Sequence, residues 1–178
     1  MKDIALPSHL FMQSTEDTPV DFDTALAHAG QARRNGNQVI SGALYIEREL
    51  EHVIGLYLYP SPPITEQQRF VAAHILGADF LTFAAKKRLV LTIVNEKGLL
   101  EGKAKATFEE ELGKVMLYRN AFSHGDVIEK GGSTYLKYFR GGPQEQELTD
   151  EYFDRIVATV RSVEKQIEAI KRAVMPPT

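Results

Sequence analysis

The sequence predicts an all-α fold, a bundle of four to five helices with a short β-hairpin inserted before the last helix. Apolar residues recur at helical spacing in several long segments, and clusters of proline and glycine separate these segments. Near residue 131, a glycine pair lies between two short runs rich in β-branched and aromatic residues. The length of 178 residues fits one domain spanning 1–178.

The N-terminal third predicts an irregular arm followed by a long helix. Residues 1–20 mix Pro, Ser, Thr and acids, so we expect no regular structure there. A helical pattern begins near Asp23, with a break expected at 35–37, where the sequence is Asn-Gly-Asn. Three prolines within 60–63 end the helix, because proline cannot continue the hydrogen-bond ladder. The apolar stripe consists of Val39, Ile40, Ala43, Leu44, Leu50, Val53, Ile54 and Tyr57.

Two further helices are expected in the middle of the chain. One begins after Thr65, has a possible break at Gly77 and continues to about Asn95. Its segment 89–94 is β-branched enough to form a strand, but the residues before it do not alternate, so we expect helix.

The next helix has the clearest start signal in the sequence. Thr107 and Glu110 form a capping-box pattern, in which each side chain bonds the other residue's backbone amide. The segment 120–125 should end this helix, with Gly125 as a left-handed terminator.

A hairpin insertion over 126–140 and a final helix complete the expected fold. Short apolar runs at 127–128 and 135–139 flank the glycine turn. Thr149 is the expected N-cap of the last helix, with Leu148 and Phe153 as its hydrophobic staple, and residues 175–178 should fray. The expected buried stripe is Phe153, Ile156, Val157, Val160, Val163, Ile167 and Ile170.

Composition excludes several classes of function. The chain has no Cys, which excludes disulfides, a thiol nucleophile, iron–sulfur clusters and Cys-type zinc sites. The net charge of −3 means that any nucleic-acid contact must come from a local patch. The five His residues lack ligand spacing and no phosphate-binding glycine loop is present, so we expect neither a metal nor a cofactor. Without a signal peptide or a bilayer-spanning run, we expect a soluble cytoplasmic protein that does not contact membranes.

One segment, residues 118–125, combines groups that could cleave RNA without a metal. Arg119 supplies a fixed cation for a phosphate, and His124 an imidazole that can exchange a proton near neutral pH. Asn120 and Ser123 can orient the imidazole or bond a phosphate oxygen. In such a reaction the RNA 2′-hydroxyl is the nucleophile, and the protein supplies acid–base help and charge stabilisation.

The spacing alone is weak evidence, because the chain holds a second Arg-x4-His match at Arg69 and His74. That pair is separated by apolar residues within an expected helix, whereas Arg119 is followed by a polar residue. We expect His124 at a helix end, where the chain can turn the imidazole back toward Arg119.

Residues 119–124 resemble the Arg-x(4–6)-His signature of HEPN domains (higher eukaryotes and prokaryotes nucleotide-binding), which are α-helical bundles. A polar residue directly after the Arg, here Asn120, is typical of that family. The order of long helices, motif, short excursion and final helix is also similar over residues 37–174. Many HEPN domains are metal-independent endoribonucleases in toxin–antitoxin, CRISPR or phage-defence systems.

The resemblance implies a function, site residues and partners. Arg119 and His124 would be the catalytic pair and Asn120 would support them. RNA would be the substrate, and a homodimer would bring two motifs into one cleft. An antitoxin protein is the other implied partner. HEPN toxins paired with minimal nucleotidyltransferases often carry a Tyr two residues after the His, but this chain has Asp126, which argues against modification by such an antitoxin.

Two alternative interpretations stay open. Some HEPN domains are non-catalytic modules that bind a nucleotide, an RNA or a protein partner. In a purely structural interpretation, Arg119 pairs with an acid within 109–111 or on a neighbouring helix, and His124 caps the helix end. Glu47, which interrupts the first apolar stripe, either pairs with Arg119 or lies at the stripe's edge.

A basic segment before the motif could contact the RNA backbone. Residues 86–105 carry a local charge of +4, and we expect Lys103 and Lys105 to bind RNA. Lys137 and Arg140 on the hairpin could extend this surface. The alternative is an ordinary solvated helix face. The basic residues of the segment are Lys86, Lys87, Arg88, Lys97, Lys103 and Lys105.

Overall fold

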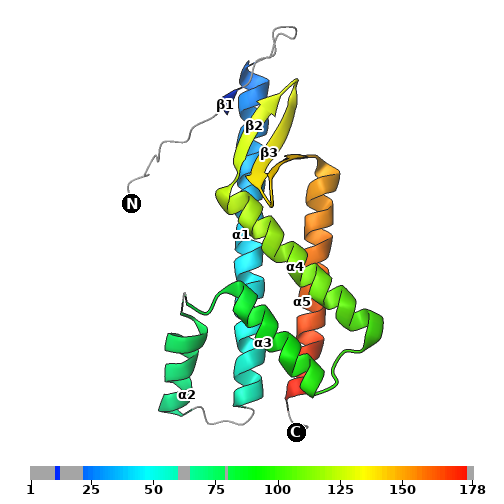
Figure 1. Cartoon of the computed structure of the whole chain (residues 1–178). Helices are drawn as coiled ribbons and strands as arrows, with labels where there is room; N and C mark the ends of the chain where they lie inside the picture. Colours follow the sequence, from blue (N-terminus) through cyan, green and yellow to red (C-terminus); the bar gives the residue numbers. More distant parts are fainter. Residues whose placement is uncertain (1–10, 13–21, 60–64, 79, 176–178) are drawn as a thin grey trace.

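The computed structural model describes residues 11–12, 22–59, 65–78 and 80–175, which form a mostly helical fold with a small sheet before the last helix (Figure 1). This agrees with the predicted bundle and hairpin. In chain order the elements are β1 (Phe11–Met12), α1 (Phe22–Leu58), α2 (Glu66–Val71), a π-helical turn η1 (Ala72–Leu76), α3 (Phe83–Glu96), α4 (Gly102–His124), β2 (Asp126–Lys130), β3 (Ser133–Phe139), β4 (Pro143–Glu147) and α5 (Asp150–Val174).

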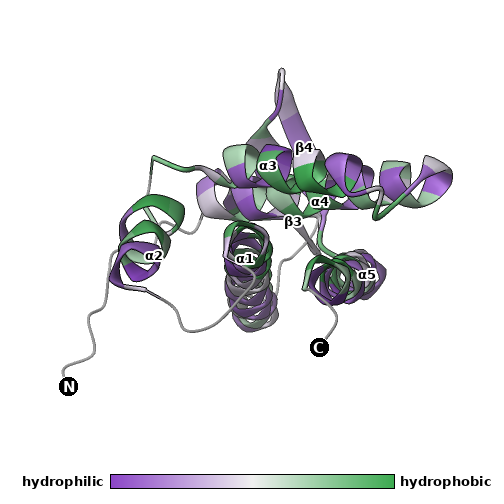
Figure 2. Ribbon diagram, turned by 90° about the horizontal axis from the view of Figure 1, so that it is seen from below, coloured by the Kyte–Doolittle hydropathy of each residue, from purple (hydrophilic) through white to green (hydrophobic). Residues whose placement is uncertain are grey.

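Four helices enclose the core in two layers. Figure 2 shows α1 and α5 side by side in one layer, with α3 and α4 lying across them in the other. Because each helix turns an apolar stripe inward, the stripes meet between the layers. The largest fully buried side chains include Ile46, Leu50 and Val53 of α1, Val90 and Val94 of α3, Phe108, Leu112 and Val115 of α4, and Ile156, Ile167 and Ile170 of α5.

Helix α1 is continuous, so the break predicted at 35–37 is wrong. The absence of a side chain at Gly36 makes room for α4, because a Cβ atom there would lie 2.7 Å from Cδ1 of Phe122. Packing against a distant residue thus outweighs the poor helix propensity of glycine. The helix ends at Leu58, just before the proline cluster, as predicted.

The region between α1 and α4 largely follows the prediction. Thr65 caps α2 in a reciprocal capping box with Gln68. The helical run breaks at Gly77, and the β-branched segment 89–94 is helical within α3.

Helix α4 begins six residues earlier than predicted, at Gly102, with Glu101 and not Thr107 at the N-cap position. Thr107 therefore lies inside the helix, where the preceding turn already provides carbonyl partners for the backbone amides, and the predicted capping box is wrong. Residues 103–106 read Lys-Ala-Lys-Ala, which are all strong helix formers, and they extend the helix beyond the core.

The sheet is larger than the predicted hairpin. Strands β2 and β3 pair antiparallel around Gly131 and Gly132, whose φ angles of 59° and 80° suit a two-residue hairpin turn. Strand β4 adds to β3, so the insertion ends at Glu147 and not at residue 140. Its sequence, Pro-Gln-Glu-Gln-Glu, has no β-branched or aromatic residue, and so gave no strand signal.

The predicted irregular arm contains one paired segment. Residues Phe11–Met12 form β1, which pairs in parallel with β2. The rest of the predicted arm lies outside the described residues, as do residues 176–178 of the predicted frayed end.

Helix α5 begins as predicted, with the Thr149 side chain accepting a hydrogen bond from the Tyr152 amide. Leu148 and Phe153 pack against the same buried cluster, as a staple should. Val157 is an error in the predicted buried stripe, because it is 45% exposed. It follows the fully buried Ile156 by one residue, which turns it about 100° away from the core.

Candidate functional site

The four motif residues lie in the last two turns of α4, where this helix meets the sheet. Arg119 is half-buried, and Asn120, Ser123 and His124 are exposed. His124 is the last residue of the helix, as the sequence predicted for the helix end. The motif is therefore accessible to a large ligand such as a nucleic acid.

Gly125 joins the motif helix to the sheet through close backbone contacts. Its φ of −96° and ψ of 161° are extended, so the predicted left-handed terminator is wrong. The need for glycine is steric: a Cβ atom would lie 2.4 Å from the Ala121 carbonyl oxygen and 2.7 Å from that of Lys137. These contacts fix the end of α4 against β3, and so fix the position of His124.

Arg119 has no ion pair within the described part of the chain. Its Nη1 donates a hydrogen bond to Oδ1 of Asn120 at 3.2 Å. Because one neutral amide leaves most of the five guanidinium N–H donors uncommitted, Arg119 keeps the capacity to bind an anion.

None of the carboxylates at 109–111 that the structural interpretation assigned to Arg119 forms an ion pair with it, and two of them are bonded elsewhere. Glu110 pairs with Lys114 at 2.7 Å. Glu111 accepts hydrogen bonds of 2.8 Å from Ser162 and from Gln166. This removes the simplest structural role for the arginine.

Glu47, the other candidate partner, belongs to a buried ionic cluster that sequence reasoning missed. Lys86 is 4% exposed and lies 2.7 Å from Glu47 and 2.6 Å from Glu51. Burial lowers the pKa of Lys86, but the hydrogen bonds and charges of the two carboxylates together raise it above its ordinary value. The sequence feature that could have revealed this cluster is the spacing of Glu47 and Glu51, which lie four residues apart along the apolar stripe of α1.

Arg119 and His124 leave α4 in different directions. Five residues of α-helix correspond to a rotation of about 140° and a rise of about 7.5 Å. His124 is still helical, so the chain does not turn the imidazole back toward Arg119 as the sequence suggested. Within one protein chain, Arg119 and His124 therefore lie at the same end of α4 but on different faces of the helix.

The structure does not bring the predicted RNA-binding lysines to the motif. Lys103 and Lys105 lie in the first turn of α4, about 24 and 21 Å along the axis from Arg119. The basic segment around them is not one cationic face. Lys86 is buried, and Lys87 donates to the Glu109 carbonyl at 2.9 Å.

Aromatic side chains at the end of α4 pack against α1 and α5. The Phe122 ring lies over Gly36, with its centroid 6.0 Å from that of Phe153 on α5. The Tyr118 ring meets Tyr152 edge-on at 6.2 Å. Burial raises the pKa of Tyr152 well above its ordinary value. These contacts hold the last turns of α4 against α1 and α5.

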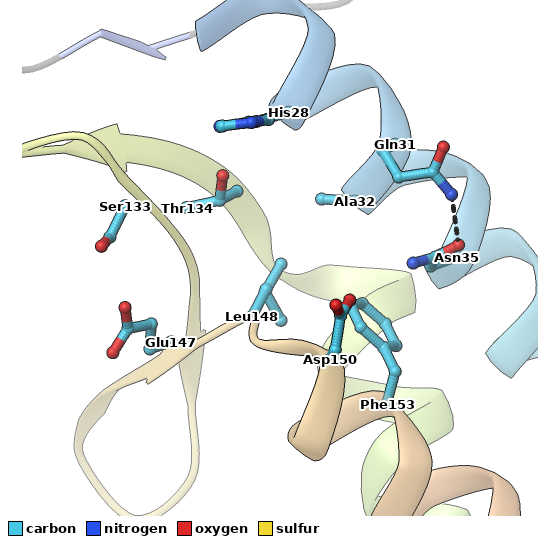
Figure 3. Close-up of a pocket in the computed structure, with 10 residues that line it drawn as sticks. All are labelled: His28, Gln31, Ala32, Asn35, Ser133, Thr134, Glu147, Leu148, Asp150 and Phe153. Carbon is cyan, nitrogen blue, oxygen red and sulfur yellow. Dashed lines mark hydrogen bonds between the residues drawn. The ribbon is translucent and has the colours of Figure 1, made fainter. Parts of the chain in front are cut away.

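A polar cavity of about 300 Å³ is lined by residues of α1, of the sheet and of the start of α5, including Phe153 (Figure 3). Its lining includes two carboxylates and no Lys or Arg, which disfavours phosphate and suits a neutral or cationic polar group. Gln31 donates a 2.9 Å hydrogen bond to Asn35 across one wall. The lining residues are His28, Gln31, Ala32, Asn35, Ser133, Thr134, Glu147, Leu148, Asp150 and Phe153.

The described residues contain no group of three or more His, Asp or Glu side chains placed to hold a metal ion. None of their helices is both long and apolar enough to cross a bilayer.

Comparison with known proteins adds no family. No protein-family model, curated protein or solved structure matches the chain.

Proposed function

We propose that this protein is a metal-independent endoribonuclease of the HEPN type. The observation that carries the proposal is the end of α4, where an exposed imidazole and an arginine without an ion pair among the described residues accompany Asn120. A purely structural arginine would be expected to have a carboxylate partner, and the nearby candidates Glu110 and Glu111 are bonded elsewhere.

In the proposed reaction, His124 accepts the proton of an RNA 2′-hydroxyl, and the resulting oxyanion attacks the adjacent phosphorus. The 5′-oxygen of the next nucleotide leaves and takes up a proton, giving a 2′,3′-cyclic phosphate and a 5′-hydroxyl. Arg119 stabilises the charge on the phosphate, and Asn120 orients the guanidinium that it already bonds.

The separation of the two groups around α4 favours a site built from two copies. If two chains meet with their α4 ends together, Arg119 of one copy can face the partner's His124. The implied homodimer would thus assemble a pair that one helix holds about 140° apart.

RNA cleavage in excess EDTA tests the proposal. We expect wild-type protein to cleave single-stranded RNA to cyclic-phosphate ends, and Arg119→Ala and His124→Ala to reduce the rate at least about 100-fold. The matched control is the second pair in the chain: Arg69→Ala and His74→Ala should leave the rate unchanged. Equal rates in all four variants would mean that the motif does not catalyse cleavage.

A non-catalytic binding module is the second candidate. With a protein as its partner, this function is favoured by Asp126, an exposed carboxylate two residues after His124 that would repel a phosphate. RNA that stays both intact and unbound in the same assay conditions, together with capture of a protein partner, would support this function over the first.

A further inference from the structure

The turn between β3 and β4 carries the most exposed large hydrophobic side chain of the described residues. Phe139 is 79% exposed, followed in the chain by the exposed Arg140. An aromatic ring exposed on a surface turn offers a flat face on which a nucleic-acid base can stack. Figure 2 shows this turn projecting away from the helix layers beside the β4 label.

The turn holds Phe139 in a defined position. Phe139 pairs with Pro143 across the two strands, and the Arg140 amide donates to the Gly142 carbonyl at 2.9 Å. Gly141 has a φ of 63°, a conformation that other residues rarely adopt. The ring is therefore presented by a short, hydrogen-bonded turn and not by a long loop.

Strand register places Phe139 at the motif end of the sheet. Asp126, the first residue of β2, pairs with Lys137 of β3. His124 precedes this pair by two residues and Phe139 follows it by two, so their Cα atoms lie within roughly 20 Å of each other. An RNA chain held at His124 can reach Phe139 within a few nucleotides.

Charge on the sheet indicates how an RNA could bind there. Lys137 lies between Asp126 and Glu145 in the strand register, and Glu145 also pairs with Lys130 at 3.0 Å. The sheet surface is thus close to neutral, and Arg140 at the turn has no ion pair among the described residues. Binding at this turn would depend on the ring, with one phosphate contact beside it.

We propose that Phe139 stacks on a base of single-stranded RNA near the cleaved bond, while Arg140 contacts a neighbouring phosphate. This inference rests on the proposed ribonuclease function and names how its substrate is held. The turn would favour unpaired RNA, because stacking on a side chain requires a base that is free of its duplex partners.

The test is RNA binding in a background that cannot cleave. Fluorescence anisotropy of a labelled single-stranded oligoribonucleotide is measured with His124→Ala protein in EDTA, with and without further substitutions. Phe139→Ala should weaken binding at least about fivefold, and Phe139→Trp should retain it, because any aromatic face can stack. Arg140→Ala should reduce the slope of log affinity against log salt by about 0.7.

A control of similar chemistry lies at the other end of the bundle. Phe70 on α2 is 59% exposed, and Figure 1 shows α2 remote from the sheet. Phe70→Ala should leave RNA affinity unchanged. An equal loss in this variant would show a general effect of surface hydrophobicity and would overturn the inference.

The outcomes separate this inference from the proposed function. If wild-type protein cleaves RNA but Phe139→Ala binds it normally, the turn is not a substrate contact and the ribonuclease function stands. If Phe139→Ala weakens binding while wild-type protein does not cleave, the turn is an RNA contact and the ribonuclease function fails. Unchanged RNA affinity with a shift from dimer to monomer, measured by light scattering, would assign the ring to a protein interface and overturn the inference.

Discussion

Replacing Gly125 by alanine tests the junction that positions His124. The extended backbone at Gly125 is open to any residue, so loss of chain freedom in the unfolded state would alone stabilise the variant by about 0.4–1 kcal/mol. Against this, the new Cβ atom would lie 2.4 and 2.7 Å from two carbonyl oxygens. These are backbone atoms that cannot rotate away, and overpacking of this kind costs about 1–3 kcal/mol. We expect a net destabilisation of about 1–2 kcal/mol.

Gly55→Ala is the matched control, because nothing lies within 4 Å of a Cβ atom at this position inside α1. At this position no steric clash opposes the substitution. Alanine lowers the conformational entropy of the unfolded chain and has a higher helix propensity than glycine, so the free energy of unfolding should rise by about 0.4–1 kcal/mol. For a chain of this size, thermal unfolding should show the Gly125 variant melting about 2–8 °C lower and the Gly55 variant about 1–4 °C higher. A Gly125→Ala protein as stable as wild type would refute the close approach of α4 to β3.

Three further outcomes follow from the site and its supports. An equal mixture of Arg119→Ala and His124→Ala proteins should recover about a quarter of the wild-type cleavage rate. Half of the dimers contain one copy of each variant, and each of these keeps one of its two sites, in which both Arg119 and His124 are present. A mixture as inactive as its components would argue against a site shared between copies. Lys86→Met should lower the free energy of unfolding by about 2 kcal/mol at pH 7, measured by urea titration, because it leaves the two carboxylates without their buried cation; an unchanged free energy of unfolding would contradict this role. Burial raises the folded-state pKa of Tyr152, so its contribution is fully present below about pH 10 and is lost as pH rises further. Tyr152→Phe should therefore flatten the fall in melting temperature between pH 10 and pH 11, and an unaltered fall would contradict this origin.

Features set by local chemistry were predictable from the sequence. The proline cluster ends α1, Thr65 and Thr149 cap α2 and α5, and the Gly131–Gly132 pair makes the hairpin turn. In each case the signal lies within four residues of the structure that it determines, so no knowledge of the tertiary fold is needed.

Features set by distant partners were not predictable. Gly36 looked like a helix break because the ring that occupies its free space, Phe122, lies 86 residues later in the chain. Strand β4 has no strand-forming composition and exists because β3 offers it an edge. Such positions depend on which segments meet, and one-dimensional patterns do not encode that.

The candidate site shows the same division. The sequence placed Arg119 and His124 near the end of a late helix, which is correct. It did not show that His124 remains helical and therefore lies on a different face of α4 from Arg119, because the sequence pattern does not fix the residue at which the helix ends. Nor did it show that Lys86 forms an ion pair with Glu47, because this contact depends on how α1 and α3 cross.

The pairing of α1 with α5 also constrains when the chain can fold. Val39 and Ile156 share one buried cluster, and Lys171 reaches Glu49 at 2.7 Å, yet about 90 residues separate the two helices in sequence. At a synthesis rate of roughly 5–20 residues per second, several seconds pass between the emergence of α1 and that of α5 from the ribosome. During that interval the α5-facing side of α1 is exposed to water, so the part of the core that these two helices share forms only after synthesis is nearly complete.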